Sequence, residues 1–124
     1  MTVRNVAIVS VPVSDQDRAR DFYTDVLGLE VREDELMGES MRWLRLSPRG
    51  GEATISLVTW FPSMPPGSSK GLVLLVDDLE AMLARLAAAG VATANGIETA
   101  PWGRFAQVDD PDGNGLVLQQ APPA

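Results

Sequence analysis

The sequence predicts an α+β fold built from two tandem modules, each with the element order strand, helix and three further strands. Three observations predict it: each half begins with a β-branched run, continues with apolar residues at helical spacing, and ends with further strand candidates. The two halves also share a spacing. Asp15 precedes Gly28 by 13 positions, and Asp78 precedes Gly90 by 12 positions.

In the first half, the valine- and isoleucine-rich segment Val3–Val13 is typical of a strand. Ser14 and Asp15 are N-cap candidates, because their side-chain oxygens can accept hydrogen bonds from the free amides of a helix start. Gly28 suits the left-handed position that often ends a helix. The apolar stripe of this helix is Ala19, Phe22, Tyr23 and Val26, and the strands expected after it are Leu29–Arg32, Met41–Leu46 and Thr54–Trp60. The acidic run Glu33–Glu35 is expected at a solvated strand end or in a loop.

The second half repeats this order. A strand is predicted at Leu72–Val76, followed by N-cap candidates Asp77 and Asp78 and by a helix that ends at Gly90. Further strands are predicted at Val91–Ala94, Phe105–Val108 and Leu116–Gln119, with the turn Asp110–Asn114 before the last of them. We therefore expect one domain over residues 1–124, with modules at about 1–61 and 71–121 joined by a Pro/Ser/Gly-rich linker at 62–70. Each module is too small to bury a good core alone, so the two must pack together or against another chain.

Composition excludes several classes of function. The chain has no Cys and no His, so it has no thiolate nucleophile and lacks the usual neutral-pH base and transition-metal ligand. Its net charge of −7 disfavours binding to a phosphate backbone, so no nucleic-acid partner is expected. Its apolar runs are shorter than a membrane span and none reads as a signal peptide. We expect a cytoplasmic protein with no membrane partner.

Three segments resemble the vicinal-oxygen-chelate superfamily, which includes glyoxalases, bleomycin-resistance proteins and extradiol dioxygenases. The segments are Val13–Gly28, Val76–Val91, and Pro101–Arg104 followed by Asp110–Asn114. Each is weak alone, but the three in this order span almost the whole chain. The resemblance implies curved mixed sheets around a cavity, and a homodimer.

Metalloenzymes of this superfamily hold a divalent ion with His or Gln on the first strand of each module and Glu near the end of each module's last strand. By spacing, the four positions fall on Ile8, Ser56, Gly71 and Val117, with Val58 as the alternative to Ser56 if the register slips. These residues are poor metal ligands. The resemblance therefore implies the metal-free, drug-binding branch, with no metal, no cofactor and no catalytic residue assigned.

Side chains alternate across a strand, so the candidate ligand-binding residues follow from parity with those four positions. Trp43 and Trp60 are expected to stack on a flat ligand, with core or dimer packing as the alternative, whereas Trp102 is expected near the rim, with anchoring of its loop as the alternative. Arg45 would be a rare buried charge that needs a partner or a ligand. The complete candidate set is Ser10, Met41, Trp43, Arg45, Ser56, Val58, Trp60, Trp102, Phe105 and Gln119.

Three functions remain open. The first is a metal-independent binding protein that confers antibiotic self-resistance by sequestering a large aromatic natural product, such as a bleomycin, mitomycin or enediyne, unchanged. The second is a glyoxalase-like lyase or isomerase that works without the usual metal. The third is a regulatory subunit without a small ligand. The expected partners are a small-molecule natural product and a second copy of the chain.

Overall fold

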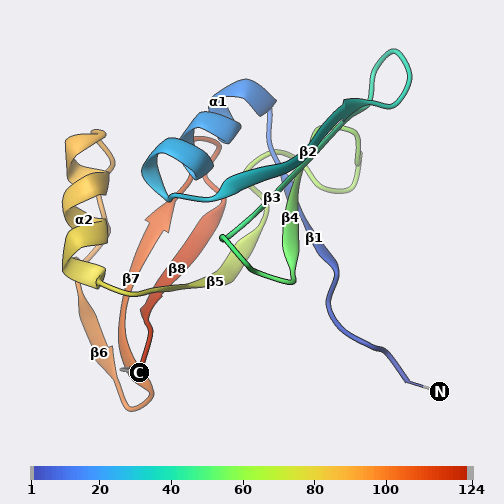
Figure 1. Ribbon diagram of the computed structural model, residues 1–124. Helices are drawn as coiled ribbons and strands as arrows, with labels where there is room; N and C mark the ends of the chain where they lie inside the picture. Colours follow the sequence, from blue (N-terminus) through green and yellow to red (C-terminus); the bar gives the residue numbers. More distant parts are fainter. Residues whose placement is uncertain (1, 123–124) are drawn as a thin grey trace.

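Two four-stranded mixed sheets and two helices make up the computed structural model, which describes residues 2–122 (Figure 1). The strand order is β1-β4-β3-β2 in the first sheet and β5-β8-β7-β6 in the second. In each sheet the first strand of the module runs parallel to its last strand, and the other pairs are antiparallel. The α+β architecture of two strand-helix-three-strand modules is therefore confirmed. The ends of the predicted domain, residues 1 and 123–124, lie outside the described residues.

The first module contains α1 (Gln16–Asp21), which continues as a π-helical segment at Phe22–Val26. Its strands are β1 (Ile8–Pro12), β2 (Glu30–Leu36), β3 (Arg42–Ser47) and β4 (Thr54–Val58). The second module contains α2 (Leu79–Ala88). Its strands are β5 (Lys70–Val76), β6 (Glu98–Ala100), β7 (Gly103–Asp109) and β8 (Gly115–Gln120). No helix of the described residues is long and apolar enough to cross a membrane.

Both helices begin and end where the sequence predicts. The carboxylate of Asp15 accepts a hydrogen bond from the Arg18 amide at 3.0 Å, and that of Asp78 accepts one from the Ala81 amide at 3.0 Å. These bonds satisfy amides that have no partner within the helix. Gly28 and Gly90 have φ values of 84° and 78°, the left-handed conformation expected of residues that follow a helix.

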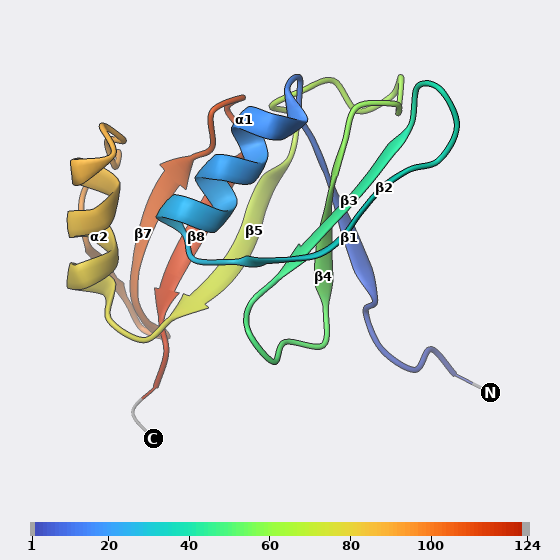
Figure 2. The ribbon, with the colours of Figure 1, turned by 45° about the horizontal axis from the view of Figure 1, so that its top comes forward.

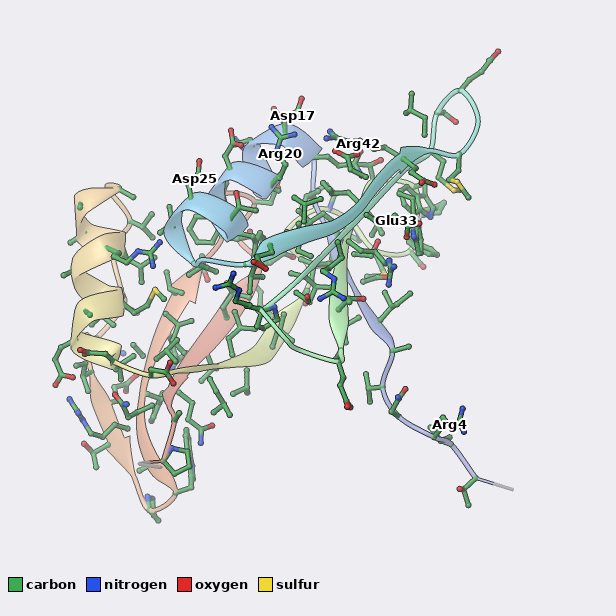
Figure 3. All side chains as sticks on the ribbon, viewed as in Figure 1. Arg4, Asp17, Arg20, Asp25, Glu33 and Arg42 are labelled. Carbon is green, nitrogen blue, oxygen red and sulfur yellow. The ribbon has the colours of Figure 1, made fainter. Side chains whose placement is uncertain are left out.

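The predicted limits of three strands are wrong, since β4 ends two residues before Trp60 and two others differ as follows, and one further predicted strand does not form. Residues 3–7 precede β1 instead of belonging to it, and their segment, which carries Arg4, extends away from both sheets (Figures 1 and 3). β2 runs on to Leu36, because pairing with β3 holds the acidic run in the sheet. Val91–Ala94 is not a strand: the Val91 amide donates to the Leu86 carbonyl at the helix end, and the second sheet takes Glu98–Ala100 as its edge instead.

One hydrophobic core joins the two modules. In Figure 2, α1 lies between the two sheets and α2 flanks the second sheet. The helix-side faces of the strands supply most of the core, which also includes the apolar stripe of α1 and residues of α2. Its fully buried members include Val11, Ala19, Tyr23, Leu44, Leu57, Leu79, Leu86, Ala106 and Leu118. This shared core agrees with the expectation that neither half buries enough apolar surface alone.

A buried polar clasp also joins the modules. The carboxylate of Asp110, in the turn between β7 and β8, accepts hydrogen bonds from the Tyr23 hydroxyl and the Asn114 side-chain amide, both at 2.8 Å. It also accepts bonds from the backbone amides of Asp112 and Asn114 at 2.9 Å. Asn114 in turn donates to the Pro12 carbonyl at 2.8 Å. Burial, and then the adjacent negative charge of Asp110, raise the pKa of Tyr23, so this hydroxyl stays a proton donor to the carboxylate.

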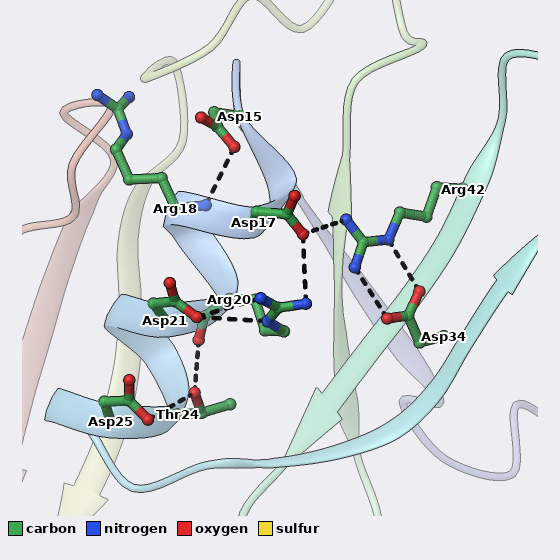
Figure 4. Close-up of polar contacts among 9 residues, drawn as sticks. All are labelled: Asp15, Asp17, Arg18, Arg20, Asp21, Thr24, Asp25, Asp34 and Arg42. Carbon is green, nitrogen blue, oxygen red and sulfur yellow. Dashed lines mark hydrogen bonds and ion pairs between the residues drawn. The ribbon is translucent and has the colours of Figure 1, made fainter.

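On the helix side of the first sheet, Arg42 links three elements (Figure 4). Its guanidinium donates to Asp34 on β2 through Nε and Nη2, and to Asp17 on α1 through Nη1, each at 2.8 Å. These bonds from Arg42 lower the pKa of both carboxyl groups. Arg42 thus ties the start of α1 to the edge of the sheet, while Arg45, three residues on, lies on the opposite face.

Candidate functional site

The first sheet has two chemically different faces. Its helix-side face carries aliphatic core residues such as Leu57, whereas its other face carries polar and aromatic ones. On this second face, Ser56 of β4 is aligned with Ser10 of β1 and with Arg45 of β3. Three of the candidate residues from three different strands are therefore neighbours across the sheet. We call this surface the open face of the first sheet.

Arg45 has a partner that the sequence did not indicate. β2 contains a register irregularity between Val31 and Glu33, after which Glu33 is aligned with Arg45. The Nε of Arg45 donates to the Glu33 carboxylate at 2.8 Å, and both side chains are about 30% exposed (29% and 30%). Figure 3 labels Glu33 on β2. The expectation of a solvated strand end or loop for the acidic run is corrected, because cross-strand pairing with β3 brings Glu33 onto the open face.

Ser56 lies at the centre of this polar group and is fully buried, with a relative exposure of 0%. Within residues 2–122 its hydroxyl has no hydrogen-bond partner. Ser10 beside it is half-buried. A buried hydroxyl without a partner costs free energy comparable to a lost hydrogen bond, so few occur in folded proteins.

Aromatic rings continue the open face along the sheet. The ring centroids of Trp43 and Trp60 are 6.1 Å apart, and those of Trp60 and Phe61 are 5.9 Å apart. Trp43 and Trp60 are half-buried, and Phe61 is exposed. Phe61 is absent from the candidate set, although its position next to Trp60 is a signal in the sequence. Two further candidates each lie two residues before one of these tryptophans. Val58 is buried in β4, and Met41 is half-buried just before β3.

The remaining candidates form a separate group on the second sheet. Trp102 and Phe105 stack with ring centroids 4.9 Å apart, and Phe105 is aligned with Gln119 of β8. Gln119 is aligned in turn with Leu75 of β5. Leu75 is 63% exposed and Trp102 is 56% exposed, so this face presents apolar surface to solvent. The strand registers thus divide the ten candidates into two sets, seven from the first module and three from the second.

A pocket of about 670 Å³ lies elsewhere, between the modules, and is lined by residues of both sheets and of α2. That volume is within the range of ligand sites. The pocket is lined mainly by aliphatic side chains and contains no aromatic residue and none of the ten candidates; its lining includes Val9, Leu46, Ile55, Leu72, Leu74 and Met82. The alternation of side chains along a single strand does not predict this pocket, because the pocket forms where the two modules meet.

The four positions that correspond to the superfamily's metal ligands do not fit a divalent ion. They supply two aliphatic side chains, one glycine and the hydroxyl of Ser56. Within the described part of the chain, no group of three or more His, Cys, Asp or Glu residues is arranged to hold a metal. The charged pair nearest to Ser56 is Arg45 and Glu33, and a guanidinium bonded to the carboxylate competes with any cation for it.

Comparison with known proteins agrees with this architecture. The family model of the Glyoxalase/Bleomycin resistance protein/Dioxygenase superfamily matches residues 5–118. The crystal structure of TnmS3, described as an antibiotic binding protein from Streptomyces sp. CB03234, has 45% sequence identity and a TM-score of 0.91, and the match covers 98% of this chain and 99% of that one.

A glyoxalase/bleomycin resistance protein from the same Streptomyces strain has 47% identity and a TM-score of 0.84, with coverage of 94% of this chain and 100% of that one. YetH of Bacillus subtilis (strain 168) is 29% identical over 121 residues, which are 95% of this chain and 99% of YetH. The family model spans both modules, from before β1 to the last strand. This chain belongs to the Glyoxalase/Bleomycin resistance protein/Dioxygenase superfamily.

Proposed function

We propose that this protein binds a large, flat, conjugated natural product without changing it chemically, as a self-resistance protein that sequesters an antibiotic of bleomycin, mitomycin or enediyne type. One observation carries the proposal: an aromatic row of Trp43, Trp60 and Phe61 adjoins a polar group on the open face of the first sheet. Aromatic rings bind flat ligands by stacking, and a few polar groups orient them. Similarity to TnmS3, an antibiotic binding protein, supports the same function.

The open face is a better site for such a ligand than the 670 Å³ pocket. Stacking requires aromatic side chains, and none lines the pocket, whereas Trp43 and Trp60 lie on the open face with their rings tilted by 32°. Several aliphatic residues that line the pocket, such as Leu46 and Leu118, also belong to the core. The hydrophobic core explains why these residues are apolar and buried, so their presence in the pocket does not by itself indicate a ligand.

Sequestration also fits the chemistry of the open face better than catalysis does. A general base must accept a proton, and the carboxylate of Glu33 is already bonded to Arg45. Tyr23, the single tyrosine, donates a hydrogen bond to Asp110 in the core. The residues of the open face thus serve to hold and orient a ligand, without a metal or other cofactor.

A test of this function is titration of intrinsic tryptophan fluorescence with anthraquinone, enediyne and glycopeptide antibiotics, with and without EDTA. We expect at least one compound to bind with micromolar or tighter affinity, to be unaffected by the chelator, and to be recovered unchanged by mass spectrometry. A chemically altered compound would favour the lyase or isomerase. If no compound binds, the regulatory subunit becomes the better interpretation.

We further propose that a second copy of the chain completes the site. The exposed apolar face of the second sheet includes Val73, which is 50% exposed, together with Leu75 and Trp102. Apolar surface of this kind is commonly buried by association. Pairing this face with the open face of another copy would bring the two sets of candidate residues into one cavity.

This assembly predicts a homodimer. Light scattering should give twice the chain mass of 13.3 kDa at micromolar concentration. Leu75→Asp should shift the mass to the monomer, because it places a charge in the buried interface. The control Thr99→Asp changes an exposed residue of β6 in the same sheet and should leave the dimer intact. A monomeric wild-type protein would contradict the model.

A further inference from the structure

Four residues of the open face form a polar cluster that the fold of a single chain leaves incomplete: Ser10, Glu33, Arg45 and Ser56. We call it the serine–arginine cluster. Ser56 belongs to β4, which lies between β1 and β3, and is aligned with Ser10 on one side and Arg45 on the other. Glu33 extends the row to the edge strand β2.

The Ser56 hydroxyl is the unusual member. It is fully buried and has no hydrogen-bond partner within residues 2–122. An alanine at this position would fill the same place in the sheet without burying an unpaired polar group. A hydroxyl at this position therefore requires an acceptor or donor that is supplied from outside the chain, and its neighbours on the open face make a ligand the natural source.

Arg45 indicates what that ligand group is. Its Nε is bonded to Glu33, while its terminal nitrogens have no hydrogen-bond partner among the residues that the structure describes. The cluster therefore offers N–H donors from Arg45 and hydroxyl groups from two serines. The charge of the guanidinium is already balanced by Glu33, and a carboxylate or phosphate would meet the repulsion of that carboxylate. A neutral acceptor oxygen fits this environment.

The distance from the cluster to the aromatic row also limits the ligand. Trp43 and Arg45 are two residues apart on one strand, so their side chains project from the same face about 7 Å apart. A ring stacked on Trp43 and Trp60 would thus bring an oxygen attached to it to the cluster. In the proposed complex, the longer side chain of Arg45, which is aligned with Ser56 in the sheet, changes its rotamer to let the ligand oxygen reach the buried hydroxyl.

We propose that the serine–arginine cluster binds a neutral carbonyl oxygen carried by the ring system that stacks on Trp43 and Trp60. This inference rests on the proposed binding function and specifies its ligand class: flat conjugated compounds with a ring carbonyl, in preference to the corresponding hydrocarbons. Ser56 and Arg45 are the residues that determine this preference.

The test compares two probes that differ mainly in their carbonyl oxygens, 1,4-naphthoquinone and naphthalene, by equilibrium dialysis against the wild-type protein. We expect the wild type to bind the quinone about tenfold more tightly, a difference that hydrogen bonds from Ser56 and Arg45 can provide. Ser56→Ala and Arg45→Met should each reduce this preference to about twofold while leaving the affinity for naphthalene unchanged. Ser68→Ala, in an exposed loop, is the matched control and should keep the preference.

A thermal melt separates the loss of recognition from a loss of folding. Ser56→Ala removes an unpaired buried hydroxyl, so its midpoint of unfolding should equal or exceed that of the wild type. Equal wild-type affinity for the two probes, or a preference that survives Ser56→Ala, would overturn the inference while leaving the stacking function intact. Failure of both probes to bind would also contradict the proposal that flat ligands stack on Trp43 and Trp60.

Discussion

Replacing Trp43 or Trp60 by alanine is expected to weaken ligand binding by about 2–4 kcal/mol, which is a loss of roughly 30- to 1,000-fold in affinity. The two rings lie 6.1 Å apart on the open face, so each truncation removes one part of a shared stacking surface. The effects of the two substitutions should not add, because the residues are in contact. Isothermal titration with the compound that gives the strongest fluorescence quenching measures the loss.

The control for this experiment is Met82→Ala. Met82 belongs to α2 and lines the 670 Å³ pocket, whereas no residue of the aromatic row lines that pocket. If the ligand binds at the open face, this variant should bind with nearly wild-type affinity. If Met82→Ala weakens binding and Trp43→Ala does not, the ligand occupies the pocket between the modules, and the assignment of the site is wrong.

Asp110→Ala should lower the free energy of unfolding by about 3–5 kcal/mol, the range in which a buried hydrogen-bond network is broken. The substitution leaves the Tyr23 hydroxyl, the Asn114 side-chain amide and two backbone amides without their acceptor. For a domain of this size, the midpoint of thermal unfolding should fall by roughly 10–20 °C. Circular dichroism melts and urea titrations measure both quantities.

Two variants test whether this effect arises from the clasp. Tyr23→Phe removes a single partner of the carboxylate and should cost about 1–2 kcal/mol. Asp109→Ala changes the exposed neighbouring carboxylate and should stay within about 0.5 kcal/mol of the wild type. A loss below about 1 kcal/mol for Asp110→Ala would contradict the view that the clasp holds the two modules together.

Most of the fold could be predicted because its signals are local. The caps Asp15 and Asp78 and the helix-ending glycines Gly28 and Gly90 have their predicted roles, since capping depends on residues within one or two turns. The strand after α2 was misplaced for the same reason. Val91–Ala94 has β propensity, but the sheet edge is chosen by pairing with β7, which a local pattern does not record.

The candidate site was predictable in part. Alternation along each strand correctly grouped Ser10, Ser56 and Arg45 on one face, because side-chain parity is a property of the strand itself. The partner of Arg45 was not predictable, because a register irregularity in β2 decides that Glu33 is aligned with it. Phe61 is not among the candidates for a different reason: it lies three residues beyond the end of β4 at Val58, where strand parity gives no guidance.

The sequence by itself determined the order of the elements, the helix limits, and the residue types at the superfamily's four metal positions, since these follow from residue identity and short-range spacing. Only the tertiary structure decided that Tyr23 donates to Asp110, 87 positions away, and that Ser56 is buried beside Arg45 without a partner of its own. The physical reason is that such contacts depend on how the strands pair and the modules pack. Their free energy comes from burial and from hydrogen bonds between residues distant in the chain.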